Sequence, residues 1–179
     1  MRRIVLAFVT TAALGLAFPA LAPRIASAGE EQLKESDVPK PVIDAVKKKY
    51  PKGKLKSFGK EIEKDKSVTY EVEVEDGKRQ IDVELTPEGK IKCEEETIKP
   101  EDAPEKIKKA LAASKYGKWQ VKHCERVVYE EKEEDPSFEY LVENDTQRFE
   151  IVLDKNGKIT KEEEKKKPKA GEKEDDEKD

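Results

Sequence analysis

Residues 81–91 read Ile-Asp-Val-Glu-Leu-Thr-Pro-Glu-Gly-Lys-Ile, and residues 149–159 read Phe-Glu-Ile-Val-Leu-Asp-Lys-Asn-Gly-Lys-Ile. In each stretch the first, third and fifth residues are apolar, which is the period of a strand with one buried face. Glycine near the end of each stretch favours a tight turn into a following strand. The two stretches lie 68 residues apart. The sequence therefore predicts the same β-hairpin twice.

A helical pattern precedes each of these hairpins. It starts at Asp37 and again at Asp102, and a proline follows two residues later in both cases. Aspartate favours the N-cap, and proline fits the first turn, where its missing N–H breaks no hydrogen bond. Apolar residues then recur at helical spacing. These patterns lie 65 residues apart, so we interpret the acidic loop at residues 130–136 as the site of a three-residue insertion.

Each unit therefore consists of one helix followed by four antiparallel strands. The predicted fold class is α+β: a tandem repeat of one helix packed on a roughly four-stranded antiparallel sheet. The expected strands are at residues 55–63, 67–75, 78–85 and 90–97, and at residues 119–130, 137–143, 147–153 and 158–163.

Composition and the N-terminal sequence indicate export. Of 179 residues 44% are charged, and the net charge of −4 excludes a basic nucleic-acid binder. Residues 1–28 begin with Arg2-Arg3, continue without charge over residues 4–23 and end in Ala26-Ser27-Ala28, which is typical of a cleavable signal peptide. A retained N-terminal anchor is the alternative. We expect a periplasmic or secreted protein with no membrane contact after cleavage.

The remaining chain divides into four segments. Residues 29–36 form a linker, residues 37–98 the first repeat and residues 99–164 the second repeat. Residues 165–179 are rich in lysine and acidic residues and contain no apolar run, so we predict a disordered charged tail.

The residues of catalytic chemistry are sparse. The single histidine, His123, precedes Cys124 in an expected strand, where neighbours point to opposite faces and cannot form a nucleophile–base pair. Residues 154–157 resemble the start of a calcium loop, but the downstream glutamate is not at the required spacing. We therefore predict no catalytic residue, no metal site and no cofactor.

Cys93 and Cys124 are the only cysteines, and an exported chain permits their oxidation. Strand parity places Cys93 on the inward face with Ile91. The parity of Cys124 is opposite to that of Val121, which places it outward unless a bulge intervenes. Because the last strand of the first repeat and the first strand of the second could be neighbours, a Cys93–Cys124 disulfide stays open.

Charge is segregated in both repeats: the helices and their exits carry lysines, and the outward strand positions carry acids. Like charges that face each other across strands destabilise a sheet, so an acidic face in both copies indicates a cationic partner. The alternative is an ordinary solvated sheet face. Leu141 and Val152 interrupt this face as apolar contact points. Trp119, Val121 and Tyr129 are interpreted as covering the core under the second helix, and exposed aromatic anchors for a partner protein are the alternative. The candidate partner-binding residues are Glu71, Glu73, Glu75, Asp82, Glu84, Glu139, Leu141, Glu143, Glu150 and Val152.

Several short motifs resemble the PepSY-like domain family, the group described as β-lactamase-inhibitor-like. They are Val38-Pro39 with Val42 and Ala45, Tyr-Pro-Lys-Gly-Lys at residues 50–54, Tyr70-Glu71-Val72 and the Gly-Lys turn. The resemblance covers residues 37–164 in two tandem copies, although the second has Tyr116-Gly117 in place of Tyr-Pro. It implies an exported bacterial protein with a fold similar to β-lactamase inhibitory protein. The wider family is associated with inhibition or regulation of secreted peptidases, and no site residue carries over because the motif is structural.

These patterns favour an exported, non-catalytic protein-binding module that inhibits or regulates a secreted or periplasmic hydrolase. The expected partner is an extracytoplasmic protein with a basic patch, and nucleic acid is not expected. The alternative is an acidic cation-binding periplasmic protein without a defined protein partner. An enzyme ranks lowest.

Overall fold

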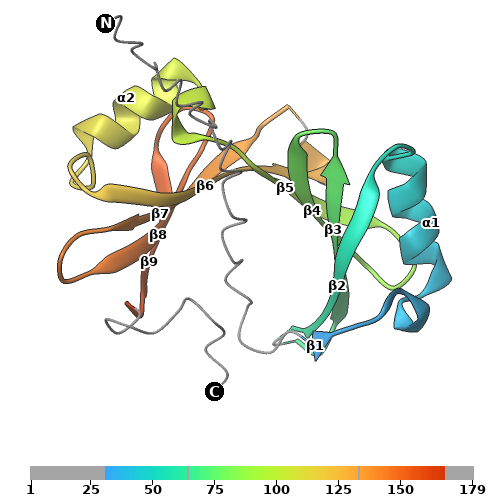
Figure 1. The fold of residues 1–179 in the computed structure, drawn as a ribbon. Helices are drawn as coiled ribbons and strands as arrows, with labels where there is room; N and C mark the ends of the chain where they lie inside the picture. Colours follow the sequence, from blue (N-terminus) through green and yellow to red (C-terminus); the bar gives the residue numbers. More distant parts are fainter. Residues whose placement is uncertain (1–30, 64, 133, 168–179) are drawn as a thin grey trace, which may run out of the picture.

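A computed structural model describes residues 31–63, 65–132 and 134–167, and within these ranges the chain forms nine strands and two short α-helices (Figure 1). The expected signal peptide and most of the charged tail lie outside the described residues. Neither helix within these ranges has the length and apolar character needed to span a bilayer. The helices are α1 (Lys40–Lys49) and α2 (Glu105–Ala113); the 3-10 helices are η1 (Glu35–Asp37), η2 (Pro100–Asp102) and η3 (Glu130–Lys132); the strands are β1 (Glu31–Gln32), β2 (Lys54–Ile62), β3 (Val68–Asp76), β4 (Arg79–Leu85), β5 (Ile91–Thr97), β6 (Gln120–Tyr129), β7 (Ser137–Glu143), β8 (Arg148–Leu153) and β9 (Ile159–Lys165).

All strands of the described ranges belong to one antiparallel sheet, whose order follows the chain from β1 to β9. β5 of the first repeat pairs with β6 of the second, with Glu95 opposite Val127. The predicted α+β class is therefore wrong: the protein is mostly β, with one nine-stranded sheet rather than a four-stranded sheet in each repeat. The physical reason is that each separate sheet would leave an edge of unpaired backbone groups, which β5 and β6 satisfy in each other.

Both helices begin at a proline rather than at an aspartate. Pro39 and Pro104 occupy the cap positions, and neither helix has a side-chain cap hydrogen bond. The predicted N-caps are therefore wrong, because Asp37 and Asp102 end the short helices η1 and η2 instead. A residue before proline avoids the helical conformation, so the residue between each aspartate and its proline is extended and separates the two helical segments.

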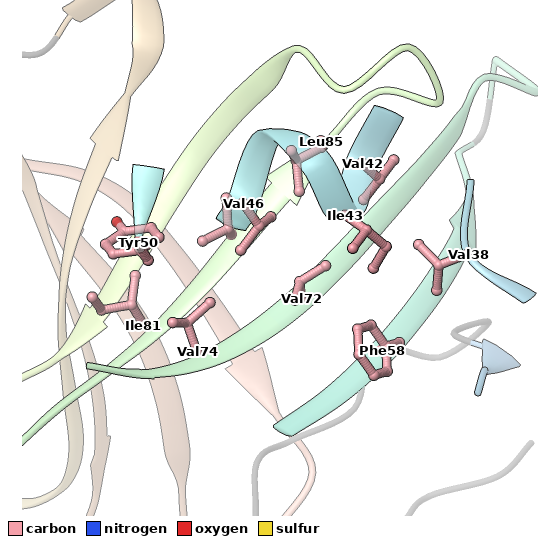
Figure 2. Close-up of a cluster of buried hydrophobic side chains, with 11 residues drawn as sticks. Val38, Val42, Ile43, Val46, Tyr50, Phe58, Val72, Val74, Ile81 and Leu85 are labelled. Carbon is pink, nitrogen blue, oxygen red and sulfur yellow. The ribbon is translucent and has the colours of Figure 1, made fainter. Parts of the chain in front are cut away.

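Two hydrophobic cores lie under the two helices, one in each repeat. In the first, Val42 and Val46 of α1 are fully buried in one cluster with Val72 and Leu85 of the sheet (Figure 2). In the second, Ile107 is the buried residue of α2. The first core comprises Val38, Val42, Ile43, Val46, Tyr50, Phe58, Val72, Val74, Ile81, Val83 and Leu85; the second comprises Ala103, Ile107, Tyr116, Cys124, Phe138, Tyr140, Val142, Ile151 and Leu153.

Both helices cover the same face of the sheet. One row of paired residues runs across four strands from Ile81 through Glu96 and Arg126 to Phe138. Ile81 belongs to the core under α1 and Phe138 to the core under α2. The opposite face, called the uncovered face below, is therefore continuous across both repeats and lies on the inner side of the bend between them (Figure 1).

Each repeat contains β-bulges at equivalent positions. The strand register skips Lys56 between β2 and β3, and it skips Lys122 between β6 and β7. It likewise skips Lys92 between β4 and β5, and Thr160 between β8 and β9. An extra residue in one strand reverses the face to which the following side chains point. These bulges decide which residues reach the uncovered face.

Candidate functional site

All ten candidate partner-binding residues lie on the uncovered face. The β3–β4 hairpin places Glu73 opposite Asp82, and the β7–β8 hairpin places Leu141 opposite Glu150. These positions alternate with core residues along each strand, so the period of two that predicted them holds in the structure. By strand, the residues are Glu71, Glu73 and Glu75 on β3, Asp82 and Glu84 on β4, Glu139, Leu141 and Glu143 on β7, and Glu150 and Val152 on β8.

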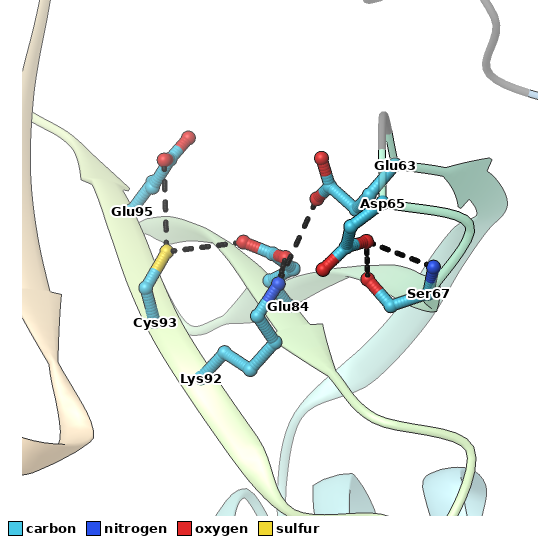
Figure 3. A network of polar contacts seen from close by, with 7 residues as sticks. All are labelled: Glu63, Asp65, Ser67, Glu84, Lys92, Cys93 and Glu95. Carbon is cyan, nitrogen blue, oxygen red and sulfur yellow. Dashed lines mark hydrogen bonds and ion pairs between the residues drawn. The ribbon is translucent and has the colours of Figure 1, made fainter.

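The bulge at Lys92 adds residues that the sequence did not place on this face. Beyond it, Cys93 lies opposite Glu84 and Glu95 lies opposite Asp82. The sulfur of Cys93 is 3.7 Å from a carboxylate oxygen of Glu84 and 3.7 Å from one of Glu95 (Figure 3). The predicted inward position of Cys93 is therefore wrong, and Glu95 was missed for the same reason.

The bulge at Lys122 has the opposite effect on Cys124. This residue pairs with Tyr140 in the second core, whereas the parity of an unbroken strand placed it outward. His123 and Glu125 take the uncovered face instead, with His123 Nε2 at 2.8 Å from Glu125 Oε1. This hydrogen bond raises the pKa of His123, although burial opposes the shift. The register skips Lys56 in the first repeat and Lys122 in the second at equivalent positions, and this repeated lysine is the sequence signal that could have indicated the bulge.

Cys93 and Cys124 are free and buried, so the disulfide left open by the sequence is not present in this structure. The register places Cys93 opposite Tyr129, five residues along β6 from Cys124. At roughly 3.4 Å per strand residue the two cysteines are too far apart for a bridge, which requires Cα atoms within about 7 Å. They also point to opposite faces of the sheet.

Carboxylates of neighbouring strands oppose each other in the middle of the uncovered face. Glu73, Asp82 and Glu95 form one row across β3, β4 and β5. Glu125 faces Glu139 across β6 and β7, close to the junction of the repeats. Directly opposed like charges destabilise a sheet, so the folded state carries an electrostatic cost here. We call these five residues the central carboxylates.

The pKa of Glu139 shows the combined effect of burial and of the neighbouring carboxylates. Burial, followed by the charges of Glu150, Glu95 and Glu125, raises the pKa of Glu139 to about 8. Glu95 belongs to the first repeat and the other three to the second. Carboxylates of both repeats therefore act on one group, and this happens only because β5 pairs with β6.

Cations neutralise many of the carboxylates nearer the edges of the face. Glu75 lies 3.3 Å from Lys54, and Arg148 Nη2 lies 2.9 Å from Glu143. The expectation of an extended acidic face is therefore too simple, because several of its carboxylates are paired with lysine or arginine. Further pairs are Glu84 with Lys92, which also lies 3.7 Å from Glu63 (Figure 3), and Glu150 with Lys161 and Lys165.

The exposure of the apolar residues on this face differs from what their predicted roles require. Leu141, expected as a contact point, is only 8% exposed. Tyr129, interpreted as a core residue, is 49% exposed and faces Cys93 on the uncovered side. Val152 is half-buried opposite Glu139. The accessible aromatic contact at the junction is therefore Tyr129, and its strand parity relative to Val127 places both on the uncovered face.

The geometry fits charge recognition better than metal coordination. Within the described ranges, no group of three or more His, Cys, Asp or Glu residues is arranged to hold a metal ion. The central carboxylates lie in extended rows, and a row presents negative charge to a broad surface rather than to one point. An arrangement of this kind suits several Lys or Arg side chains of a partner.

Comparison with known structures identifies the same fold in proteins of Bacteroides. A protein of Bacteroides eggerthii described as a "putative periplasmic" protein shares 18% identity at a TM-score of 0.62 and is matched over 71% of this chain and 88% of its own. A protein of Bacteroides fragilis described as BLIP-like shares 20% identity at a TM-score of 0.59, over 71% of this chain and 86% of its own. A DUF2874 family protein of Bacteroides uniformis shares 17% identity at a TM-score of 0.62, over 71% of this chain and 89% of its own.

The comparison with curated proteins gives no match. The family model described as "Putative beta-lactamase-inhibitor-like, PepSY-like" matches residues 27–92 and again residues 89–161. These two regions together span most of the chain and correspond to the two repeats that the sequence predicted. The chain therefore belongs to the PepSY-like family and contains two tandem copies of its domain.

Proposed function

We propose that the protein is an exported, non-catalytic binding module whose uncovered face binds a basic surface of another extracytoplasmic protein. The observation that carries this proposal is the opposition of carboxylates across β3, β4 and β5 and across β6 and β7. These contacts cost stability in the isolated protein. A partner that presents Lys and Arg side chains to them would relieve the repulsion, and this gain would contribute to affinity and association rate.

Export and an inhibitory role have their own support. The N-terminal residues 1–28 have the composition of a cleavable signal peptide, and one similar solved structure is described as that of a "putative periplasmic" protein. The family description and a BLIP-like structural neighbour support inhibition or regulation of a secreted or periplasmic hydrolase. A fold does not determine a function, so the decisive evidence is which residues the partner needs.

The test is affinity capture from the periplasmic and secreted fractions, at low and high salt. We expect one or a few basic proteins to be retained at low salt and to be lost at high salt, because screening weakens contacts between exposed charges. The variant Glu73→Gln with Glu95→Gln and Glu139→Gln should lose the same proteins. Capture that survives both the high salt and this triple variant would remove the uncovered face from the proposal.

A matched control separates site charge from net charge. Glu35, Glu88 and Glu105 are exposed carboxylates on or next to the helical side of the protein. Their simultaneous replacement by Gln removes at least as much negative charge as the first variant, because the raised pKa of Glu139 keeps that carboxyl largely protonated at pH 7. We expect the control to retain the partner.

Cation binding without a protein partner is the competing function. Calorimetry with calcium and magnesium distinguishes the two, because a specific site gives a saturable heat that neutralisation of the central carboxylates removes. Weak heats that the triple variant does not change would end that alternative.

A further inference from the structure

The uncovered face carries an aromatic ring that is open to solvent. Tyr129 and Ile62 are the exposed large hydrophobic side chains of the described residues. Ile62 shares its strand parity with the core residue Phe58 and therefore lies on the helical side of the sheet. Tyr129 is the last residue of β6 and lies opposite Cys93 of the first repeat. An aromatic side chain is thus presented to solvent at the junction of the two repeats.

The buried half of Tyr129 restricts the position of its ring. Its neighbours on the same face, Cys93 and Val127, are both buried. A tyrosine side chain has only two torsions, and packing against such neighbours limits them further. Binding through this ring therefore costs little conformational entropy, which is one reason why tyrosine is enriched at interface hot spots.

Carboxylates of both repeats lie near this ring. Burial is the main cause that raises the pKa of Tyr129, and Cys93, Glu95, Glu139 and Glu84 raise it further. Charged groups have such an effect only when they lie close to the titrating group. Glu84 and Glu95 belong to the first repeat and Glu139 to the second. The pairing of β5 with β6 therefore places the ring among acidic groups of both repeats.

An aromatic ring beside carboxylates favours arginine over lysine. A cation is attracted by the face of an aromatic ring as well as by a carboxylate. The planar guanidinium group of arginine can stack on a ring and donate two hydrogen bonds to a carboxylate, whereas the ammonium group of lysine is a strongly hydrated point charge. An arginine that enters beside Tyr129 and pairs with Glu95 makes both kinds of contact.

The arginines of this chain are already engaged within the described ranges. Arg79 lies 2.8 Å from Glu96, and Arg148 lies 2.9 Å from Glu143. Arg126 lies on the helical side, opposite Glu96. A second copy of the chain would have to break such contacts to supply an arginine, so the expected partner is another protein.

The shape of the sheet limits the form of this partner. The uncovered face lies on the inner side of the bend between the repeats (Figure 1), and a flat surface does not reach the bottom of a concave face. From the exposed ring, its acidic neighbours and the bend, we propose that the junction binds an arginine on a protruding segment of another extracytoplasmic protein, with the guanidinium group stacked on Tyr129 and paired with Glu95. This inference rests on the proposed function and adds to it the residue type with which the partner binds.

The test compares two capped peptides of equal length and charge, in which glycine alternates with four arginines or with four lysines. NMR titration of the whole chain at low salt and pH 7 should shift amides around Tyr129 and leave those around Ile62 unchanged. We expect the arginine peptide to bind about threefold more tightly, which is the size of a cation–π contact at an exposed site. Glu95→Gln should weaken the binding of both peptides, whereas Glu88→Gln, at an exposed position outside this face, should not.

Two variants at one position decide the role of the ring. Tyr129→Leu removes the ring but keeps an apolar side chain, so it should lose most of the preference for arginine. Tyr129→Phe keeps the ring and should keep the preference. The amide spectrum of each free variant checks that its fold is unchanged.

The outcomes separate this inference from the proposed function. If neither peptide binds, or if Glu95→Gln and the triple variant bind both as the native chain does, the proposed function is contradicted together with this inference. If both peptides bind equally well, if the shifts avoid Tyr129, or if Tyr129→Leu retains the preference, the arginine contact alone is overturned.

Discussion

Replacement of Glu139 by glutamine should stabilise the protein at neutral pH. Burial and three neighbouring acids raise the pKa of this carboxyl to about 8, from an ordinary value of 4.5. Between these two values the folded chain keeps a proton that the unfolded chain has lost. Stability associated with Glu139 is therefore fully present below pH 4.5 and falls as the pH rises to about 8. Glutamine carries no titrating proton and removes this dependence.

The magnitude follows from the same pKa values. Each pKa unit corresponds to about 1.4 kcal/mol. The difference between pH 7 and the ordinary carboxyl pKa of 4.5 therefore gives an upper limit of about 3 kcal/mol for the stability that Glu139 removes at pH 7. Glu139 keeps some contact with solvent, and the charge of Lys161 lowers its pKa in part. We therefore expect Glu139→Gln to raise the free energy of unfolding by about 2 kcal/mol at pH 7 and by little near pH 4.

The assay is urea unfolding of both proteins at several values between about pH 4 and pH 8. Glu143→Gln is the matched control, because Glu143 lies on the same face of β7 but accepts hydrogen bonds from the buried Arg148. Burial acts to raise the pKa of Glu143, but the contacts with Arg148 and Lys122 lower it overall. The control should therefore destabilise the protein by about 1–3 kcal/mol at pH 7. Equal effects of both variants, or a pH profile of Glu139→Gln parallel to that of the native chain, would refute the reasoning.

Two further predictions concern the turns and the thiols. In urea unfolding, Gly89→Ala should destabilise the protein by about 3 kcal/mol or more and Gly77→Ala by about 1 kcal/mol. Both glycines have positive φ, but only at Gly89 would the new Cβ lie 2.4 Å from the carbonyl oxygen of Pro41. Similar losses of stability in the two variants would contradict this contact. Alkylation without reductant should modify neither cysteine in the native chain and both after denaturation, because burial raises the pKa of the Cys124 thiol to about 12 and also raises that of Cys93. A failure to label the denatured chain would show a disulfide, and mass spectrometry of the intact chain reads either outcome.

Much of the local structure could be predicted from the sequence because it depends on neighbours along the chain. The duplicated hairpin turns contain Gly89 and Gly157, both at a φ of +83°, as the repeated Gly-Lys-Ile step required. The period of two in β3, β4, β7 and β8 placed ten residues on one face, and all ten lie there. These assignments depend on the alternation of side chains within one strand, which a single sequence shows directly.

The β-bulges explain most of the errors at the candidate site. The skipped residues Lys92 and Lys122 break the alternation inside β5 and β6, so Cys93 and Cys124 exchanged their expected faces. Glu95 and Glu125 were missed because they follow the same bulges. A bulge depends on how a strand fits its neighbour, and the period of one strand contains no information about that fit.

The error in the fold class has a separate cause, and it concerns the proposed function directly. Whether β5 and β6 pair is a long-range choice between two strands that α2 separates in the chain. Two separate four-stranded sheets would have kept Glu95 of the first repeat away from Glu125 and Glu139 of the second. Their pairing instead produces one negative field that neither repeat has alone, so the raised pKa of Glu139 depends on the junction. If the uncovered face binds a basic partner, the most negative part of that face therefore arises from the pairing of the two repeats. An isolated repeat should then bind the partner with much less than half of the binding free energy of the whole chain.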